Sequence, residues 1–378
     1  MNLLAEAAVL LTCFGIVQCF LGLRAVRRFA GTEATEPSHL PPVTILRPLC
    51  GQEPLLEEAL ESCFLQSYPD FQIVFGVHSA ADPALEVVEA MRRRYPEREV
   101  SVVVDSRTYG PNRKVSNLIN MLPAARHDVL VISDSDLHLP RDYLRGLVTA
   151  LETPGTGLVT SLYYGAPSSI DNWVGTLGAT QISHHFLPGV LLSCQMGRQD
   201  CLGSTAMFSR DTLERIGGFM PLVQLLAEDN VLGQRVRKLG LSIRLGRHVP
   251  AATVPERSLR PLWQHELRWT RTIRELEPLL LAASTLQYPL FWAAISVLLS
   301  GAASWSLVIF LGSWLARALC ARGVDDALRD LLGRPAHATP LWLFPLRDCL
   351  SVVEIGASFW VNEVVWRGHR MGASGAIQ

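Results

Sequence analysis

The segment Val129-Leu130-Val131-Ile132-Ser133-Asp134-Ser135-Asp136 places two carboxylates directly after a short apolar run. Such a run, bounded by polar residues, is typical of a strand that is buried in a parallel sheet. Ligands of open α/β sheets bind outside the carboxyl ends of the strands, where Asp134 and Asp136 would lie. The pair can hold a divalent metal beside a diphosphate, although Asp-x-Asp also occurs as solvated turn chemistry.

Three more apolar runs precede this segment, and amphipathic segments separate them. The runs that predict strands are 43–49, 72–78 and 100–105, and the segments that predict helices are 54–66, 83–95 and 114–125. The alternation predicts an α/β fold with a Rossmann-like, mostly parallel sheet. The following part is less regular, with a predicted strand at 157–164, a predicted helix at 172–186 and a loop at 197–203.

An apolar run from Ala7 to Leu23 is followed at once by Arg24, Arg27 and Arg28. Its length is near the lower limit for crossing a bilayer. A cleavable signal peptide carries its positive charge before the apolar core, so this run predicts an uncleaved membrane anchor. The arginines predict that the chain emerges on the cytoplasmic side.

Two apolar segments lie near the other end. Residues 288–319 are almost free of charge, which is compatible with one long span or a helical hairpin. Residues 341–365 are interrupted by Arg347, Asp348, Glu354 and Glu363, so this segment is re-entrant, interfacial, or a span whose charges face protein. The alternative is that both segments are buried core helices.

Composition excludes some classes of function. The formal net charge of −1 gives no reason to expect nucleic acid as a partner. The eight cysteines show no zinc-ligand spacing and no Cys-x-x-Cys pair, which predicts reduced thiols. Glycine pairs such as Gly217-Gly218 lack the spacing of Walker or dinucleotide-binding loops. Nucleotide triphosphate hydrolysis and nicotinamide chemistry are therefore not expected.

Two further segments can contact a nucleotide. Asp82 follows the second predicted strand and can accept hydrogen bonds from a base or a ribose, or it can cap the helix that begins near Pro83. Arg113 and Lys114 lie near a helix N-terminus, where cations are unusual. A bound diphosphate would explain them, and the alternative is a pair of solvated surface charges.

Two later segments can contribute to catalysis. Glu228-Asp229 begins a predicted helix, where carboxylates can complement the helix dipole or take a proton from an attacking hydroxyl. Asp229 is the favoured base. In Trp263-Gln-His-Glu-Leu-Arg-Trp269, helical spacing places His265, Arg268 and Trp269 on one cationic and aromatic face. Arg268 can bind phosphate there, although an interfacial helix with snorkelling arginines would show the same pattern.

Asp82, Asp134-Ser-Asp136, Glu228-Asp229 and Arg268-Trp269 follow one another in the order of a known signature. They resemble the D, DxD, (E)D, QxxRW series of family-2-like inverting glycosyltransferases. With the flanking apolar segments, nearly the whole chain resembles the ceramide glucosyltransferase family. This resemblance implies an anchor at 1–28, a linker at 29–42, a cytosolic GT-A domain at 43–280 and a membrane-associated region at 281–378.

The resemblance also implies site roles. A UDP-sugar would bind Asp82, Lys114 and Asp134, Asp136 would hold Mg²⁺ or Mn²⁺, and His265, Arg268 and Trp269 would join Asp229 in catalysis. The signature has Gln or Arg four residues before its Trp, a position that His265 occupies here, with Gln264 before it, so either side chain can fill the role. His184 resembles a family position near the lipid acceptor, although a helix-surface histidine is the alternative.

Within this family, the segments 201–205, 227–233 and 265–271 look most like the bacterial hopanoid-biosynthesis-associated glycosyltransferases. That branch implies a hexosyltransferase that moves N-acetylglucosamine from a UDP donor to a bacteriohopane polyol. It would be a multi-pass protein of the bacterial inner membrane with its catalytic domain in the cytosol. The alternatives are glucosylation of ceramide, a sphingolipid acceptor, and a non-catalytic membrane-tethered binding protein.

Overall fold

The computed structural model describes residues 3–33, 35–169, 171–333, 338–360, 363–366 and 369–372. Its contacts divide the chain into two compact units. Among the described residues, the sheet unit consists of 33–164 and 198–255, and the helical unit of 3–32, 165–197 and 256–372. The chain therefore passes repeatedly between the units, and each is described by itself.

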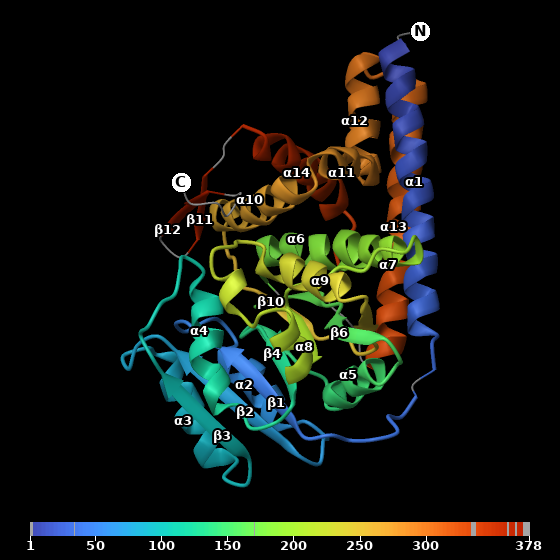
Figure 1. Ribbon diagram of the computed structural model, residues 1–378. Helices are drawn as coiled ribbons and strands as arrows, with labels where there is room; N and C mark the ends of the chain where they lie inside the picture. The colour runs from blue at the N-terminus through green and yellow to red at the C-terminus, as the bar shows by residue number, and fades with distance from the viewer. Residues whose placement is uncertain are drawn as a thin grey trace. The chain divides into compact units, whose positions relative to one another are not determined.

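The sheet unit begins with four strands, with helices in the three intervals between them (Figure 1). The elements are β1 (Val43–Pro48), α2 (Leu56–Phe64), β2 (Phe71–Val77), α3 (Ala84–Arg94), β3 (Glu99–Val104), α4 (Arg113–Met121), η1 (Leu122–Ala124) and β4 (Val129–Ser133). The four predicted strands are confirmed to within one residue at each end. The remaining elements are β5 (Leu137–His138), α5 (Tyr143–Leu151), β6 (Thr156–Ser161), β8 (Thr205–Ser209), α8 (Arg210–Arg215), η3 (Met220–Leu222), α9 (Glu228–Lys238), β9 (Ser242–Gly246) and β10 (Ala251–Val254).

Seven strands form one sheet in the order β3-β2-β1-β4-β8-β6-β9. The pairs among β1 to β4 are parallel, as predicted, and so is β6 with β9. Strand β8 runs antiparallel to both neighbours and pairs Thr205 with Ser133. The start of β8 therefore lies beside the end of β4, which brings the loop before Thr205 to the carboxyl edge of the parallel strands.

Side chains alternate between two cores because successive strand residues point to opposite faces. Ile45, Phe75 and Val131 belong to one core, whereas Leu46 and Val74 belong to the other. The first core includes buried residues of α2, α3 and α5, and the second includes those of α4, α8 and α9. The sheet thus has helices on both faces, as a doubly wound α/β fold requires.

The helical unit contains the remaining helices. They are α1 (Leu3–Ala30), α6 (Trp173–Gln181), the π-helix η2 (Ile182–Phe186), α7 (Leu187–Gln195), α10 (Leu259–Leu276), α11 (Pro278–Ala283), η4 (Ser284–Gln287), α12 (Pro289–Leu299), α13 (Ser304–Leu332) and α14 (Leu343–Ser358). A short hairpin of β11 (Glu363–Trp366) and β12 (His369–Gly372) follows. Strand β7 (Tyr164–Pro167) lies where the chain leaves the sheet unit.

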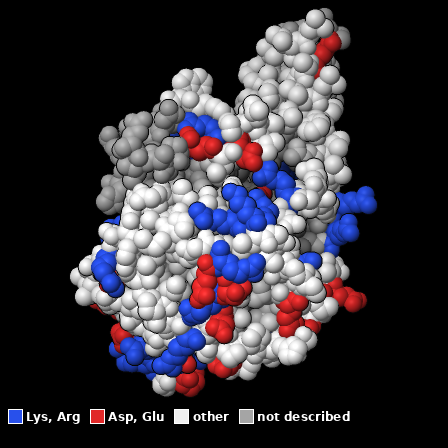
Figure 2. Space-filling model, in the orientation of Figure 1, with Lys and Arg blue, Asp and Glu red and all other residues white. Residues whose placement is uncertain are grey.

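Helices α1 and α13 are each long and apolar enough to cross a membrane. A third candidate span is the broken pair 278–287 and 289–299, bent by 72°. The predicted apolar stretch 288–319 is thus a helical hairpin of α12 and α13 rather than one span. The upper part of Figure 2, where the first half of α1 and α12 lie, carries almost no charged atoms except an acidic group near the start of α1, consistent with a lipid-facing surface.

The charged residues of the apolar segment 341–365 face protein. Arg347 and Asp348 on α14 are fully buried and Glu354 is 3% exposed. Helix α14 is not among the candidate spans in the described part of the chain. Residues 361–362 lie outside the described residues, as does the side chain of Glu363.

Candidate functional site

The loops after β1 and β2 meet at the carboxyl edge of the sheet. The backbone N–H of Gly51 donates to both carboxylate oxygens of Asp82, at 3.0 and 3.1 Å. Asp82 also accepts from the N–H of Ala84 at 3.0 Å, so it caps the start of α3. Asp82 therefore caps α3, which is one of its two predicted roles, and its hydrogen bonds with Gly51 hold the two loops together.

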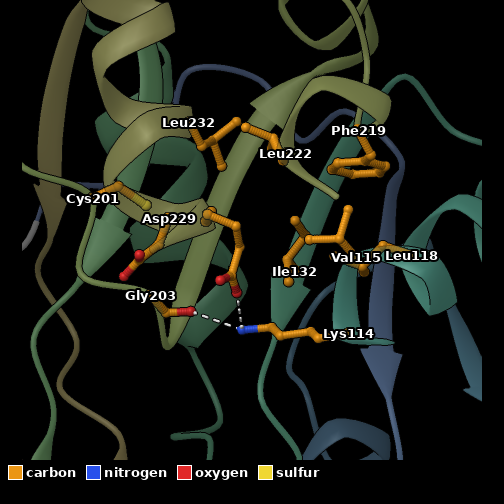
Figure 3. A pocket seen from close by; sticks show the side chains of 12 residues that line it. Lys114, Val115, Leu118, Ile132, Cys201, Gly203, Phe219, Leu222, Asp229 and Leu232 are labelled. Atoms are coloured by element: carbon orange, nitrogen blue, oxygen red, sulfur yellow. Dashed lines mark hydrogen bonds and ion pairs between the residues drawn. The ribbon is translucent and has the colours of Figure 1, made fainter. Parts of the chain in front are cut away.

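Helix α4 delivers Lys114 to this edge. The side chain of Asn112 caps α4 by accepting from Val115, and its amide donates to Glu228 Oε2 at 3.1 Å. Lys114 Nζ lies 2.6 Å from Asp134 Oδ1, 3.6 Å from Glu228 Oε1 and 3.4 Å from the Gly203 carbonyl oxygen. Figure 3 shows Lys114 reaching toward Gly203. Lys114 is an ion-paired residue, not a solvated surface charge.

Asp229 lies in the first turn of α9, opposite the loop that precedes β8. One of its oxygens accepts from the N–H of Asn230 at 2.8 Å. The other lies so close to Gly203 that an added Cβ would be 2.5 Å away. Gly203 also has φ +81°, a left-handed conformation that favours glycine. Gly203 thus leaves space for the Asp229 carboxylate (Figure 3).

The Asp134-Ser-Asp136 loop is fixed by residues of β1 and of the loop that follows it. Ser135 donates its hydroxyl to Glu53 Oε2 at 2.8 Å. The fully buried guanidinium of Arg47 donates to the carbonyl oxygens of Ser135 and Leu137, at 3.2 and 2.6 Å. The loop therefore presents its two carboxylates from a rigid backbone.

Burial and mutual repulsion raise the pKa values of two carboxyl groups here. Burial, with the charges of Asp134 and Glu53, raises the pKa of Asp136 from 3.8 to about 7. Burial, with the charge of Glu228, likewise raises the pKa of Asp229 from 3.8 to about 7. Burial disfavours the charged form of Lys114, but its carboxylate neighbours outweigh that effect and raise its pKa. The cluster is thus short of positive charge.

A small cavity lies under these groups, and Figure 3 shows its lining. Besides Lys114, Gly203, Glu228 and Asp229, its walls are Val115, Leu118, Ile132, Cys201, Ala206, Phe219, Leu222 and Leu232. The apolar walls lower the local dielectric and strengthen charge interactions at the mouth of the cavity.

His265, Arg268 and Trp269 lie together on α10 of the helical unit. His265 Nδ1 is 2.6 Å from Glu256 Oε1, and the rings of His265 and Trp269 are 4.3 Å apart. Gln264 is exposed, whereas His265 is half-buried. These contacts favour His265 over Gln264 for the signature position, an assignment that stays a proposal.

His184 is not a helix-surface residue. It is 5% exposed, and its Nε2 lies 3.3 Å from Asp325 Oδ1 on α13. The surface alternative for His184 is therefore wrong, because α13 covers this turn of η2.

The structure brings Asp82, Lys114, Asp134, Asp136 and Asp229 into the sheet unit, and it holds the α10 residues in the helical unit. Sequence reasoning did not single out Arg47, Glu53, Asn112 or Gly203. Arg47 offered a signal, because an arginine inside a buried strand requires partners. Asn112 offered another as a cap residue directly before a predicted helix.

No group of three or more His, Cys, Asp or Glu side chains could hold a metal by itself, within the ranges that the structure describes. None of the eight cysteines, all in those ranges, forms a disulfide bond.

The fold and the site define the class of protein. The sheet unit has the GT-A architecture, and the whole chain aligns with the solved mannosyltransferase PcManGT of Pyrobaculum calidifontis, a complex with GDP-Man and Mn²⁺. That alignment has a TM-score of 0.54 at 20% identity and covers 94% of this chain and 99% of that one.

The chain belongs to glycosyl transferase family 21, whose model matches residues 7–375. It is 25% identical over 256 residues to ceramide glucosyltransferase 1 of Caenorhabditis elegans, covering 66% of this chain and 53% of the relative. It is 31% identical over 205 residues to the ceramide glucosyltransferase of Komagataella phaffii, covering 52% and 38%. The chain spans about half the length of the Caenorhabditis elegans relatives that it matches.

Proposed function

We propose that the protein transfers a hexose from a UDP-sugar to a hydroxyl group of a membrane lipid. The observation that carries the proposal is the Lys114–Asp134 ion pair, with Nζ and Oδ1 2.6 Å apart, at the carboxyl edge of a GT-A sheet. Membership of glycosyl transferase family 21 supports the reaction class. The apolar helices α1 and α13 support a membrane substrate.

The donor would bind across the edge of the sheet. Asp82 and Asp134 would face the nucleoside, and Lys114 would turn from Asp134 toward the diphosphate. Because the pKa of Lys114 is raised, its amine remains charged throughout the accessible pH range and would attract phosphate. This rearrangement would leave Asp134 free to accept hydrogen bonds.

The acceptor hydroxyl would attack the anomeric carbon as the bond from that carbon to the UDP oxygen breaks. Asp229 would take the hydroxyl proton, and UDP would leave with the bonding electron pair. A carboxyl group whose pKa is about 7 suits this task, because it is a stronger base than an ordinary aspartate. A single displacement of this kind inverts the anomeric configuration.

The residues of the sheet unit fit a divalent cation. Asp136 and Asp134 would supply hard oxygen atoms of the kind that Mg²⁺ and Mn²⁺ prefer, and burial, with the charges of Asp134 and Glu53, raises the pKa of Asp136. Asp136 would hold the metal, and phosphate oxygens would complete its coordination. When bound, the metal would neutralise charge on the departing diphosphate.

The helical unit would contribute its α10 face. His265 Nδ1 lies 2.6 Å from Glu256 Oε1, and the His265 and Trp269 rings form a polar and aromatic surface beside Arg268. Arg268 would bind phosphate oxygens, and Trp269 would form a wall of the acceptor site.

For the lipid acceptor we propose ceramide first, with UDP-glucose as donor, because the similar curated proteins are ceramide glucosyltransferases. The bacteriohopane polyol with UDP-N-acetylglucosamine is the second candidate. It rests on the resemblance of segments 201–205 and 227–233 to the hopanoid branch. Both acceptors combine an apolar body with a hydroxylated end, as a membrane-held active site requires.

The test uses the full chain in lipid nanodiscs with Mg²⁺ or Mn²⁺. Each of UDP-glucose, UDP-N-acetylglucosamine and UDP-galactose is incubated with ceramide and with bacteriohopanetetrol, and products are identified by mass spectrometry. A lipid that gains one hexose, and fails to gain it with Asp229→Asn, supports the proposal. Donor binding without any product would favour a non-catalytic, membrane-tethered binding protein instead. Transfer that is insensitive to EDTA would contradict the proposed role of the metal.

We also propose that the sheet unit faces the cytosol at a bacterial inner membrane. Arg27 and Arg28 lie in the last turn of α1, as the positive-inside rule requires. Cysteines introduced at Arg92 and Glu214 should resist an impermeant thiol reagent in intact cells, in a chain whose exposed Cys13 and Cys50 are replaced by serine. If both introduced cysteines were labelled from outside the cell in active protein, the proposed cytosolic orientation of the sheet unit would be wrong.

A further inference from the structure

Helix α10 carries two sets of side chains on different faces. Leu262, Glu266 and Arg274 are buried in the helical unit. His265 and Trp269 are half-buried and their rings contact each other. Because consecutive helix residues are rotated by about 100°, seating Glu266 in the interior also determines the direction of the His265 and Trp269 face.

Glu266 is held by a buried guanidinium on α14. Arg347 Nη1 donates to both carboxylate oxygens of Glu266, at 3.0 and 2.9 Å, and its Nη2 donates to Glu354 Oε2 at 2.8 Å. Its Nε donates to the Ser351 hydroxyl at 3.0 Å. The Arg347 side chain is fully buried. Each of its three nitrogen atoms therefore has a partner in fixed geometry.

Three further hydrogen bonds brace this arrangement. Ser351 donates to Gln181 Oε1 on α6 at 3.0 Å, and Gln181 donates to the Tyr288 hydroxyl at 3.1 Å. Near the other end of α10, Arg274 donates to the carbonyl oxygen of Ser358, the last residue of α14. Helix α10 is thus tied to α14 within the turn that holds His265 and Trp269 and again nearer its C-terminal end.

Stability alone does not account for this ion triad. Removing three charges from water is costly, and well-packed apolar side chains of similar volume usually stabilise a protein as well or better. Apolar packing, however, tolerates small rotations and sliding of a helix. A planar guanidinium that donates two parallel hydrogen bonds accepts one rotation and one axial position of its carboxylate partner.

We propose that Arg347 is a positioning residue, which fixes the rotation and axial position of α10 through Glu266 and thereby orients the His265 and Trp269 face for sugar transfer. The proposal rests on the proposed function, which gives that face its role. Arg347 is buried and donates its hydrogen bonds on α10 to Glu266, so it acts through another residue and is not itself catalytic.

The test compares three variants in nanodiscs. Arg347→Lys keeps the charge and loses the parallel pair of hydrogen bonds, and the triple variant Arg347→Met, Glu266→Leu, Glu354→Leu replaces the triad by apolar packing. Arg329→Met is the matched control, because Arg329 forms an exposed pair with Asp326 on α13. Measurements are kcat, KM for the UDP-sugar, thermal unfolding, and the ¹⁹F resonance of 5-fluorotryptophan at position 269, assigned with Trp269→Phe.

We expect kcat to fall about tenfold to a hundredfold in Arg347→Lys and in the triple variant, as small misplacements of reacting groups do. KM for the donor should stay within about threefold, the triple variant should unfold no earlier than the wild type, and the resonance of Trp269 should shift or split. Arg329→Met should change none of these quantities.

An unchanged kcat and an unchanged Trp269 resonance in a folded Arg347→Lys protein would overturn the proposal. A lower kcat with an unchanged resonance and earlier unfolding would also overturn it, because the triad would then be structural only. If the wild type transfers no sugar, the proposed function fails, while the resonance and the unfolding temperature still test whether Arg347 positions α10.

Discussion

The sheet unit and the helical unit each contain a cluster of charged side chains, and the clusters differ in charge balance. In the helical unit the buried carboxylates of Glu266 and Glu354 contact Arg347, and Asp348 lies 3.3 Å from His185. In the sheet unit Lys114 contacts Asp134 and Glu228. Among the described residues, no Lys, Arg or His forms an ion pair with Asp136 or Asp229.

The difference shows which cluster is complete without a ligand. Burial, together with repulsion from neighbouring carboxylates, raises the pKa values of Asp136 and Asp229 to about 7. A cation and a nucleotide diphosphate would supply what the sheet unit lacks. In the helical unit, burial and the charge of Glu266 raise the pKa of Glu354 to about 9, so a proton on Glu354 leaves one carboxylate to balance Arg347, and the cluster serves the arrangement of helices.

The largest expected effect is on catalysis in the sheet unit. Asp229→Asn should lower kcat by about 10²- to 10⁴-fold, because the amide cannot accept the acceptor proton. UDP affinity, measured by calorimetry, should stay within a few-fold, since the base acts on the acceptor. Turnover within tenfold of the wild type would show that another group is the base.

A matched pair of substitutions tests the charge comparison directly. Glu266→Gln should lower the free energy of unfolding by about 3 kcal/mol, because it removes a charge partner of the buried Arg347. Asp136→Asn should raise the free energy of unfolding of the metal-free protein by about 1 kcal/mol, because it relieves repulsion at a ligand site. Chemical unfolding at pH 8 measures both. Destabilisation of similar size by both variants would contradict the comparison.

The space beside Asp229 gives a smaller effect. Gly203→Ala should destabilise the protein by about 1 to 2 kcal/mol through its left-handed backbone, and it should lower kcat about tenfold by displacing the Asp229 carboxylate. Gly240→Ala is the control, since Gly240 has φ +77° and open space around its Cβ position. The Gly240→Ala variant should lose about as much stability as Gly203→Ala and should keep the kcat of the wild type. Equal kcat values in the two variants would remove Gly203 from the site.

The smallest effect concerns pH. Asp229 must be deprotonated to act as base, so kcat/KM should fall as pH drops below about 7. Glu228→Gln should move this acid limb about one unit lower, because the charge of Glu228 helps to raise the pKa of Asp229. An acid limb that stays in place would exclude this coupling.

The same carboxyl group has an opposite effect on stability. Between about pH 4 and 7 the folded protein keeps a proton on Asp229 that the unfolded chain has released. The contribution of Asp229 to the free energy of unfolding should therefore decrease as pH rises through this window.

Local features of the sequence were sufficient for the first half of the sheet unit. Apolar runs and amphipathic segments predicted β1 to β4 and the helices between them, and therefore the edge at which Asp82 and Asp134 lie. The position of Gly203 could not be predicted in this way. It depends on the antiparallel pairing of Thr205 with Ser133, a contact between distant segments that leaves no local periodic signal.

The same limit applies to the helical unit. The cost of Arg347 and Glu354 in an apolar segment left open a re-entrant segment, an interfacial segment or a span whose charges face protein, and the structure buries both side chains. Their partner Glu266 could not be identified, because helical spacing shows which residues share a face and not which helix packs against it. The predicted helix at 172–186 formed as α6 and η2, and its grouping with α10 and α14 is likewise a property of packing.

The packing of α1 has a consequence for biosynthesis. Within the helical unit α1 packs on α12 and α13, where an added Cβ at Gly15 would lie 2.7 Å from the Leu286 carbonyl oxygen. The ribosome makes every strand of the seven-stranded sheet after α1 and before Pro289. Until η4 and α12 have been made, Gly15 on α1 lacks the partners that cover it in the folded protein, and an uncovered small residue on a membrane helix favours close helix association. The Gly15 side of α1 is therefore completed only after the whole sheet has been synthesised.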